Sequence, residues 1–135
     1  MTIATTPADI WLAIRQEATC LVEQEPILAS FYHSTLLKHE HLGRALSYIL
    51  ANKLATESMP AMAVREIIEE AYQDEEQLIY WAAYDIMAAY SRDPAVAFYC
   101  TPLLYFKGFL ALQAYRIAHW LWRHNRQALA LYLQS

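Results

Sequence analysis

The sequence predicts an all-α fold, a single bundle of about six to seven helices. Glycine, which weakens helices, occurs only twice in 135 residues. Apolar residues recur three and four positions apart in most segments, and no segment alternates for long with the period of two that is typical of strands. With 57% hydrophobic residues the chain can bury a core of its own. We therefore expect one domain, residues 1–135.

The first two helices are each announced by a proline. Thr6 is a favoured N-cap, and Pro7 suits the first helical position behind it. The apolar stripe of this helix consists of Ile10, Ile14, Ala18 and Leu21. Pro26 opens a second helix. Its apolar residues are Leu28, Phe31, Tyr32 and Leu36.

Three further helices are predicted before residue 91. The third ends near Leu54, and its stripe is Leu42, Ala45, Leu46, Ile49 and Leu50. The fourth starts at the Ser58-Met59-Pro60 segment and carries Arg65 and Glu69 four residues apart, a pairing typical of a solvated helix face. The fifth runs from about Glu75 to Tyr90.

The sixth helix is expected to be the longest and the most apolar. Thr101-Pro102 repeats the cap-and-proline pattern, and the helix should end near His124, with a short last helix from Arg126 onward. Its sequence, LLYFKGFLALQAYRIAHWLW, has almost no polar face. A helix without a polar face lies at the centre of a fold or against another chain. We therefore expect a homo-oligomer that forms through this helical domain.

Charge is divided unevenly along the chain. Residues 57–93 hold nine acidic and two basic residues, whereas residues 94–135 hold four basic residues and no acid. The simplest interpretation is that the two segments neutralise each other in the fold. Four basic residues spread over this length make no dense basic patch, so no nucleic-acid partner is expected.

Neither the histidines nor the cysteines predict a catalytic or metal site. His39 and His41 are two residues apart without an H-E-x-x-H motif, so they are interpreted as free surface histidines and not as metal ligands. Cys20 and Cys100 have apolar neighbours and no metal-type spacing, which favours two core residues in a reducing compartment. His119 is interpreted as a hydrogen-bonded core histidine. A glycine-rich phosphate loop is absent, which excludes the usual nucleotide site.

The chain has no feature that would place it in a membrane or direct its export. Its start, MTIATTPADIW, lacks the basic and apolar segments of a signal peptide. The longest uncharged run, residues 94–106, contains two prolines and is too short to span a bilayer. No membrane partner is expected, and the predicted location is the cytoplasm.

The segment SRDPAV, residues 91–96, is the strongest candidate for a functional site. Asp93 is a favoured N-cap with Pro94 at the first helical position behind it, while Arg92 can close the preceding helix by facing its carbonyl groups. Alternatively, the Asp93 carboxylate binds an amine or assists proton transfer. The two interpretations are compatible, because a cap uses one carboxyl oxygen and leaves the other free.

Several long blocks resemble the amino-terminal helical domain of bacterial serine acetyltransferases. They are EPILASFYHSTLLKHEHLGRALSYILANKL (residues 25–54), MPAMAVREIIEEAY (59–72), RDPAV (92–96) and TPLLYFKGFLALQAYRIAHWLW (101–122). The resemblance extends from about Trp11 to Leu133. It implies an enzyme that transfers acetyl from acetyl-CoA to the hydroxyl of L-serine, giving O-acetylserine for cysteine biosynthesis.

The resemblance also implies an assembly and one site residue. In the family a left-handed β-helix of hexapeptide repeats follows the helical domain, trimers form through the β-helices, and two trimers join through the helical domains into a hexamer. The Asp of the RDPA motif, which matches Asp93, helps to hold serine. Acetyl-CoA is the co-substrate of the whole enzyme, and this chain alone is expected to bind no cofactor and no metal.

The family pattern is met only in part. The sequence ends at ALALYLQS, where the β-helix should begin. The family's catalytic histidines, its CoA groove and the tail that docks into O-acetylserine sulfhydrylase belong to that later part. We therefore expect no catalytic residue in this chain and no acetyl transfer by it alone. Leu110 and Ala118 stand where the family would have histidine and glycine.

An alternative function is a stand-alone, non-catalytic assembly or regulatory module that co-assembles with a full-length acetyltransferase.

Overall fold

The computed structural model describes residues 6–134, and within them every regular element is helical. The α-helices are α1 (Pro7–Gln24), α2 (Ala29–Tyr32), α3 (Leu42–Leu54), α4 (Ala61–Asp74), α5 (Gln77–Arg92), α6 (Cys100–Tyr105), α7 (Lys107–Arg123) and α8 (Gln127–Gln134). This confirms the predicted all-α class. None of the helices in this part of the chain is both long and apolar enough to cross a membrane.

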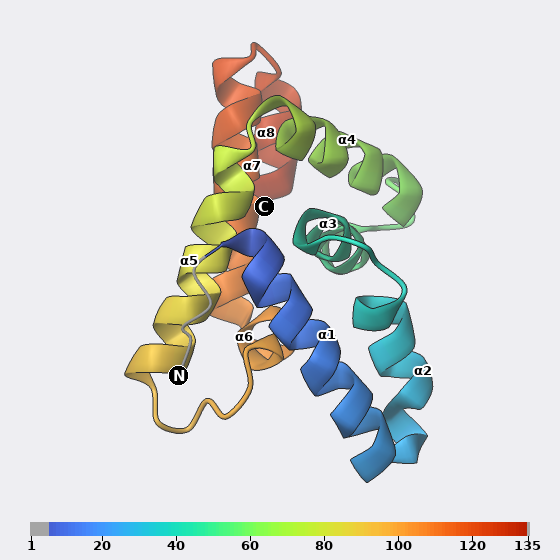
Figure 1. Ribbon diagram of the computed structural model, residues 1–135. Coiled ribbons are helices and arrows are strands. Elements are labelled where there is room, and N and C mark those ends of the chain that lie inside the picture. Colours follow the sequence, from blue (N-terminus) through green and yellow to red (C-terminus); the bar gives the residue numbers. More distant parts are fainter. Residues whose placement is uncertain (1–5, 135) are drawn as a thin grey trace.

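The helices form an elongated bundle (Figure 1). Helices α5, α7 and α8 make up one side, α1 crosses the middle, and α2, α3 and α4 form the other side. Helix α3 packs along α4, and α7 turns back into α8 as an antiparallel pair. The turn between α7 and α8 uses a positive φ of 62° at Asn125, a conformation that asparagine tolerates better than most residues.

Helix α1 begins as predicted. The Thr6 side chain accepts a hydrogen bond from the Asp9 N–H at 3.1 Å, and Pro7 is the first helical residue. Helices α3, α4, α5 and α8 also lie within about two residues of their predicted ranges.

The predicted second helix is instead divided into three short parts. A 3₁₀ turn (Pro26–Leu28) leads into α2, and a π-helical turn (His33–Leu37) follows it. The Thr35 hydroxyl donates to the Phe31 carbonyl at 2.6 Å, in competition with the regular helical bond. From α1, Arg15 donates to the Leu37 and His39 carbonyls at 2.7 Å each. These contacts satisfy carbonyl groups that the end of a helix leaves without partners.

The predicted sixth helix is wrong in two respects. Phe106 has extended backbone angles, φ −89° and ψ 105°, and separates α6 from α7. Thr101 is not the N-cap either, because α6 begins one residue earlier at Cys100 and has no side-chain cap of its own. Neither Phe106 nor Lys107 disfavours a helix strongly, and Gly108, two residues beyond the break, was the one local sign of it.

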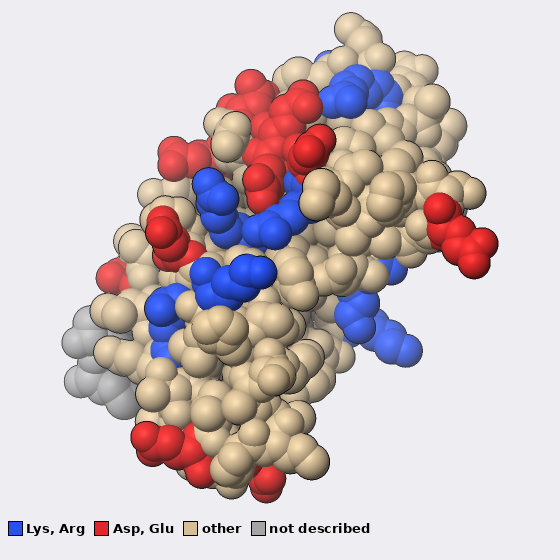
Figure 2. All heavy atoms as spheres, turned by 90° about the vertical axis from the view of Figure 1, so that its right-hand side faces the viewer, with Lys and Arg blue, Asp and Glu red and all other residues tan. Residues whose placement is uncertain are grey.

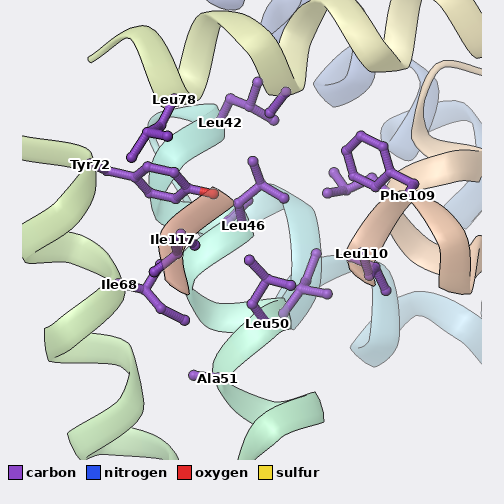
Figure 3. Close-up of a cluster of buried hydrophobic side chains, with 14 of the residues drawn as sticks. Leu42, Leu46, Leu50, Ala51, Ile68, Tyr72, Leu78, Phe109, Leu110 and Ile117 are labelled. Carbon is purple, nitrogen blue, oxygen red and sulfur yellow. The ribbon is translucent and has the colours of Figure 1, made fainter. Parts of the chain in front are cut away.

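The core lies where α3, α4 and α7 meet (Figure 3). Leu46, Ile68 and Ile117 are almost fully buried there. Tyr72 enters the same cluster from α4, and its hydroxyl points among apolar side chains. Burial of this apolar surface is the main force that stabilises the bundle.

Ion pairs join the acid-rich segment to the base-rich segment, as expected. Arg116 donates to Asp85 at 2.6 Å, His124 lies 3.3 Å from Asp74, and Arg126 lies 3.2 Å from Glu70. The Asp85 pair is the most buried of these and also accepts from the Gln113 side chain. On the face shown in Figure 2, acidic and basic side chains adjoin one another.

Candidate functional site

Asp93 lies at the carboxyl end of α5 and not at the start of a helix. Its N–H donates to the Ala89 carbonyl at 3.1 Å, and it forms the C-cap of α5. The prediction that Pro94 begins a helix is therefore wrong, because residues 93–99 form a loop and the next helix begins at Cys100. We refer to residues 93–99 as the Asp93 loop.

One carboxyl oxygen of Asp93 is engaged within this loop. Oδ1 accepts a hydrogen bond from the Ala95 N–H at 2.9 Å, and the Asp93 carbonyl accepts from the Val96 N–H at 3.0 Å. This Asx turn fixes the direction of the carboxyl group. Within residues 6–134 the structure gives Oδ2 no hydrogen-bond partner, and the side chain is exposed. One carboxyl oxygen is bonded and the other is free, as was expected of a cap, although Asp93 lies at the end of α5 and not at the start of a helix.

Arg92 does not neutralise Asp93. It lies in the last turn of α5, as predicted, and its guanidinium contacts the Tyr84 hydroxyl at 3.5 Å. A basic residue at this position also interacts favourably with the helix dipole. The Asp93 carboxylate thus remains available to a cation from solution.

The far end of the Asp93 loop is held from α1. Both carboxyl oxygens of Glu17 accept backbone hydrogen bonds, from Tyr99 N–H at 2.8 Å and from Cys100 N–H at 3.0 Å. The Tyr99 ring stacks on Tyr90 of α5 at 4.1 Å between centroids. Burial raises the pKa of Glu17, and the two backbone hydrogen bonds oppose this rise.

Sequence reasoning missed Glu17. It stands in the middle of a helix, among residues of ordinary helical composition, and no motif includes it. Its partners are more than eighty positions away along the chain. Only the packing of α1 beside α6 brings them together.

The other sequence candidates are distributed over the molecule and do not form a site. His39 is buried and not a free surface histidine: its Nε2 lies 2.9 Å from the Ser34 carbonyl, and burial lowers its pKa. His41 is exposed. His119 is also exposed and so is not the predicted core histidine. Across the described residues, no group of His, Cys, Asp and Glu side chains could hold a metal ion.

The two cysteines have opposite environments. Cys100 is a core residue as predicted, and burial, together with the nearby Glu17 carboxylate, raises its pKa to about 12. Cys20 is exposed on α1, so its assignment to the core is wrong. Its apolar neighbours along the chain were misleading, because Cys20 lies beside the buried stripe of α1 and not in it.

A large cavity in the described part of the chain lies away from Asp93. It has a volume of about 850 Å³ and lies between the first turns of α1, α3 and α5 and the end of α4. Arg15 and Arg44 on its wall are offset by three glutamates, Glu40, Glu69 and Glu76. Because the lining carries both signs of charge, it favours neither an anionic nor a cationic ligand.

The two positions that depart from the family pattern are both buried in α7. Leu110 and Ala118 have 7% and 0% of their surface exposed. Leu110 faces the apolar cluster shown in Figure 3, so a nonpolar residue fits its surroundings.

Comparison with known proteins identifies relatives for almost the whole chain. Residues 10–114 match the family described as "Serine acetyltransferase, N-terminal". The serine acetyltransferase of Haemophilus influenzae is 63% identical over 127 residues, which are 94% of this chain and 48% of that protein. That of Escherichia coli K12 is 61% identical over 126 residues, 93% of this chain and 46% of that protein. The chain thus spans about half the length of these curated relatives.

Solved structures agree with this result. A serine acetyltransferase in complex with CoA superposes with a TM-score of 0.92 at 63% identity, covering 93% of this chain and 54% of that one. The enzyme from Neisseria gonorrhoeae in complex with serine gives a TM-score of 0.88 at 45% identity, covering 93% of this chain and 51% of that one. The family match over residues 10–114 includes the Asp93 loop.

Proposed function

Because the chain belongs to the serine acetyltransferase family, we propose that residues 1–135 form the helical domain of such an enzyme, which lends Asp93 to the serine site and mediates self-association. The complete enzyme would transfer acetyl from acetyl-CoA to L-serine, giving O-acetylserine for cysteine biosynthesis. Relatives solved with CoA and with serine support this choice of substrates. The observation that carries the proposal is the exposed Asp93 carboxyl group, with one oxygen fixed and one free.

The chemistry assigns Asp93 a binding role. A carboxylate is the natural partner of the serine ammonium group, and such a charge-assisted hydrogen bond is stronger than a neutral one. In the transfer itself the serine hydroxyl oxygen attacks the acetyl carbonyl, the hydroxyl proton passes to a base, and the CoA thiol leaves. Asp93 holds the other end of serine and need not take that proton. The base and the CoA site belong to the rest of the enzyme, so the chain alone should release no CoA thiol.

A hybrid enzyme tests this role. In it, this chain replaces the aligned half of the Haemophilus influenzae relative, and the remaining half of that protein follows. Asp93→Asn should raise the KM for serine about tenfold or more while leaving the KM for acetyl-CoA unchanged, because only the serine ammonium loses a charged partner. Glu57→Gln removes an exposed acid elsewhere and serves as the control. An unchanged serine KM in Asp93→Asn would refute the assignment.

Self-association is proposed through the outer face of α7. Four exposed residues at helical spacing, which we call the α7 outer stripe, are Leu112, Tyr115, His119 and Trp122. Trp81 of α5 is also exposed and lines one surface hollow with Tyr115 and His119. Aromatic, charge-poor surface of this kind is typical of subunit contacts. A helix with its inner face in the core and its outer face still apolar fits the expectation of a homo-oligomer.

Sedimentation velocity tests the assembly. We expect the purified chain to self-associate and Trp122→Asp to make it monomeric, because the charge would have to be desolvated at the contact. Ile27→Asp is the matched control, since Ile27 is an exposed apolar residue of the 3₁₀ turn before α2 and belongs to neither α5 nor α7. A monomeric parent chain would refute the proposal. Mixed oligomers with a complete acetyltransferase on co-expression, without activity of its own, would favour the alternative of a non-catalytic assembly module.

A further inference from the structure

The Asp93 loop is fixed at both of its ends, by different means. At the near end the α5 C-cap and the Asx turn of Asp93 set the direction of the chain. At the far end the Glu17 carboxyl group bonds the Tyr99 and Cys100 N–H groups. Between the two ends Val96 is buried, whereas Ala97 and Phe98 are exposed. Because the Asx turn ties the Asp93 carboxyl group to Ala95, and the Asp93 carbonyl is tied to Val96, the geometry at Asp93 also depends on how firmly the rest of the loop is held to α1.

The Glu17 contact is well suited to this task. Each of its oxygens accepts one N–H group at the amino terminus of α6, where such groups otherwise lack partners. Helix α6 has no side-chain cap from its own segment, so a residue of α1 serves in place of one. The carboxyl group is half-buried, and within the described residues it has no Lys or Arg partner. The carboxyl group is thus stabilised by these two backbone bonds and by the Cys100 thiol.

We propose that Glu17 is a positioning residue for the serine site: by holding the end of the Asp93 loop against α1, it sets where Asp93 meets the serine ammonium group. This inference rests on the proposed role of Asp93. Glu17 itself touches neither substrate nor reacting atoms. It acts through the seven-residue loop between α5 and α6.

The chain contains its own reporter of loop opening. Cys100 is buried beside Glu17, whereas Cys20 is exposed on the same helix as Glu17, and the chain has no other cysteine. Iodoacetamide should therefore alkylate Cys20 quickly and Cys100 slowly. In Glu17→Gln the remaining side-chain oxygen can still accept one backbone hydrogen bond. The amide NH₂ group cannot accept the other and places a second donor against a backbone N–H, which weakens the contact further. We expect Cys100 to react about tenfold faster in this variant, with the Cys20 rate unchanged. Loss of the Glu17 charge also lowers the pKa of the Cys100 thiol, so the faster reaction counts as loop opening only if the Tyr99 and Cys100 amides exchange faster in the variant as well.

Glu23→Gln is the matched control, because Glu23 is an exposed glutamate one and a half turns further along α1. It should leave both thiol rates as they are. An unchanged Cys100 rate in Glu17→Gln would overturn the proposal. If that variant fails to fold, as circular dichroism would reveal, hydrogen exchange in the unaltered chain decides: the Tyr99 and Cys100 amides must exchange more slowly than those of Ala97 and Phe98. Equal exchange would overturn it.

The hybrid enzyme separates this inference from the proposed function. Glu17→Gln should raise the serine KM several-fold and leave the acetyl-CoA KM unchanged, which a general loss of stability would not do. Added to Asp93→Asn, it should have no further effect, because the contact it positions is already gone. If Asp93→Asn raises the serine KM and Glu17→Gln does not, the positioning role is wrong and the proposed function stands. If Asp93→Asn has no effect, the proposed function fails first.

Discussion

Replacing Tyr72 by phenylalanine should stabilise the protein, although most core substitutions destabilise. Among the described residues, the Tyr72 hydroxyl is the buried side-chain group with no hydrogen-bond partner. Burial raises its pKa, against the opposing influence of the Arg116 charge, so the phenol stays neutral and no charge is lost with the hydroxyl. The substitution therefore removes an unpaired polar group from an apolar cluster (Figure 3).

The magnitude follows from two opposing effects. Burying a hydroxyl without a partner costs about 1–3 kcal/mol in proteins. Removing its oxygen forfeits dispersion contacts worth a few tenths of a kcal/mol. The free energy of unfolding of Tyr72→Phe should thus rise by about 1 kcal/mol, which for a chain of this size corresponds to roughly 3–5 °C in Tm.

Urea denaturation followed by circular dichroism measures the change. Tyr132→Phe is the control, because the Tyr132 hydroxyl is bonded to the Thr56 side chain at 3.0 Å and its removal should lower stability slightly. If Tyr72→Phe lowers the free energy of unfolding by about 1 kcal/mol or more, the hydroxyl has a partner in solution and the reasoning is refuted.

Three further predictions concern stability. Burial lowers the pKa of His39 from its ordinary value of 6.5, so the unfolded chain takes up the proton first as the pH falls. The free energy of unfolding should therefore be at its full value above pH 6.5 and decrease as the pH drops through the lowered pKa. Urea midpoints at about pH 7.5 and 5.5 should show this fall, and His39→Gln should reduce it. Asp85→Ala should lower the free energy of unfolding, measured by urea denaturation, by about 2 kcal/mol, because Gln113 and Arg116 lose a half-buried acceptor. Glu69→Ala, which breaks the more exposed pair with Arg65, should lower it by under about 1 kcal/mol. Equal losses in the two variants would contradict the assigned difference in burial. Leu46→Ala should lower the free energy of unfolding by about 2–5 kcal/mol, because Leu46 is fully buried, whereas Leu131→Ala at an exposed position should lower it by under about 0.5 kcal/mol. A small loss for Leu46→Ala would show that the core lies elsewhere.

Local pattern was sufficient for much of the fold. Thr6 and Pro7 start α1 as their chemistry predicts, and the stripe from Leu42 to Leu50 becomes the buried face of α3. These features depend on neighbours within one or two helical turns, which a sequence shows directly.

What the sequence could not show depends on distant contacts. Phe106 takes an extended conformation in the middle of an apolar run, and His39 becomes buried because the chain around it packs against Trp11 and Arg15 of α1. At the candidate site, Asp93 was proposed from its motif, but Glu17 could not be, since its bonds to the loop join residues far apart in the chain. Turn chemistry was also misjudged: Asp-Pro suits a turn as well as a helix start, and the structure has the turn.

The ion pairs that join the acid-rich segment to the base-rich segment also limit how the protein can change over time. A lineage that loses the arginine at position 116 leaves Asp85 as a half-buried acid without an opposite charge, and one that loses the acid leaves a half-buried arginine without one. Substitutions at positions 85 and 116 should therefore occur together in evolution. Glu66, an exposed glutamate of α4 without such a counterpart among the described residues, is free to vary singly.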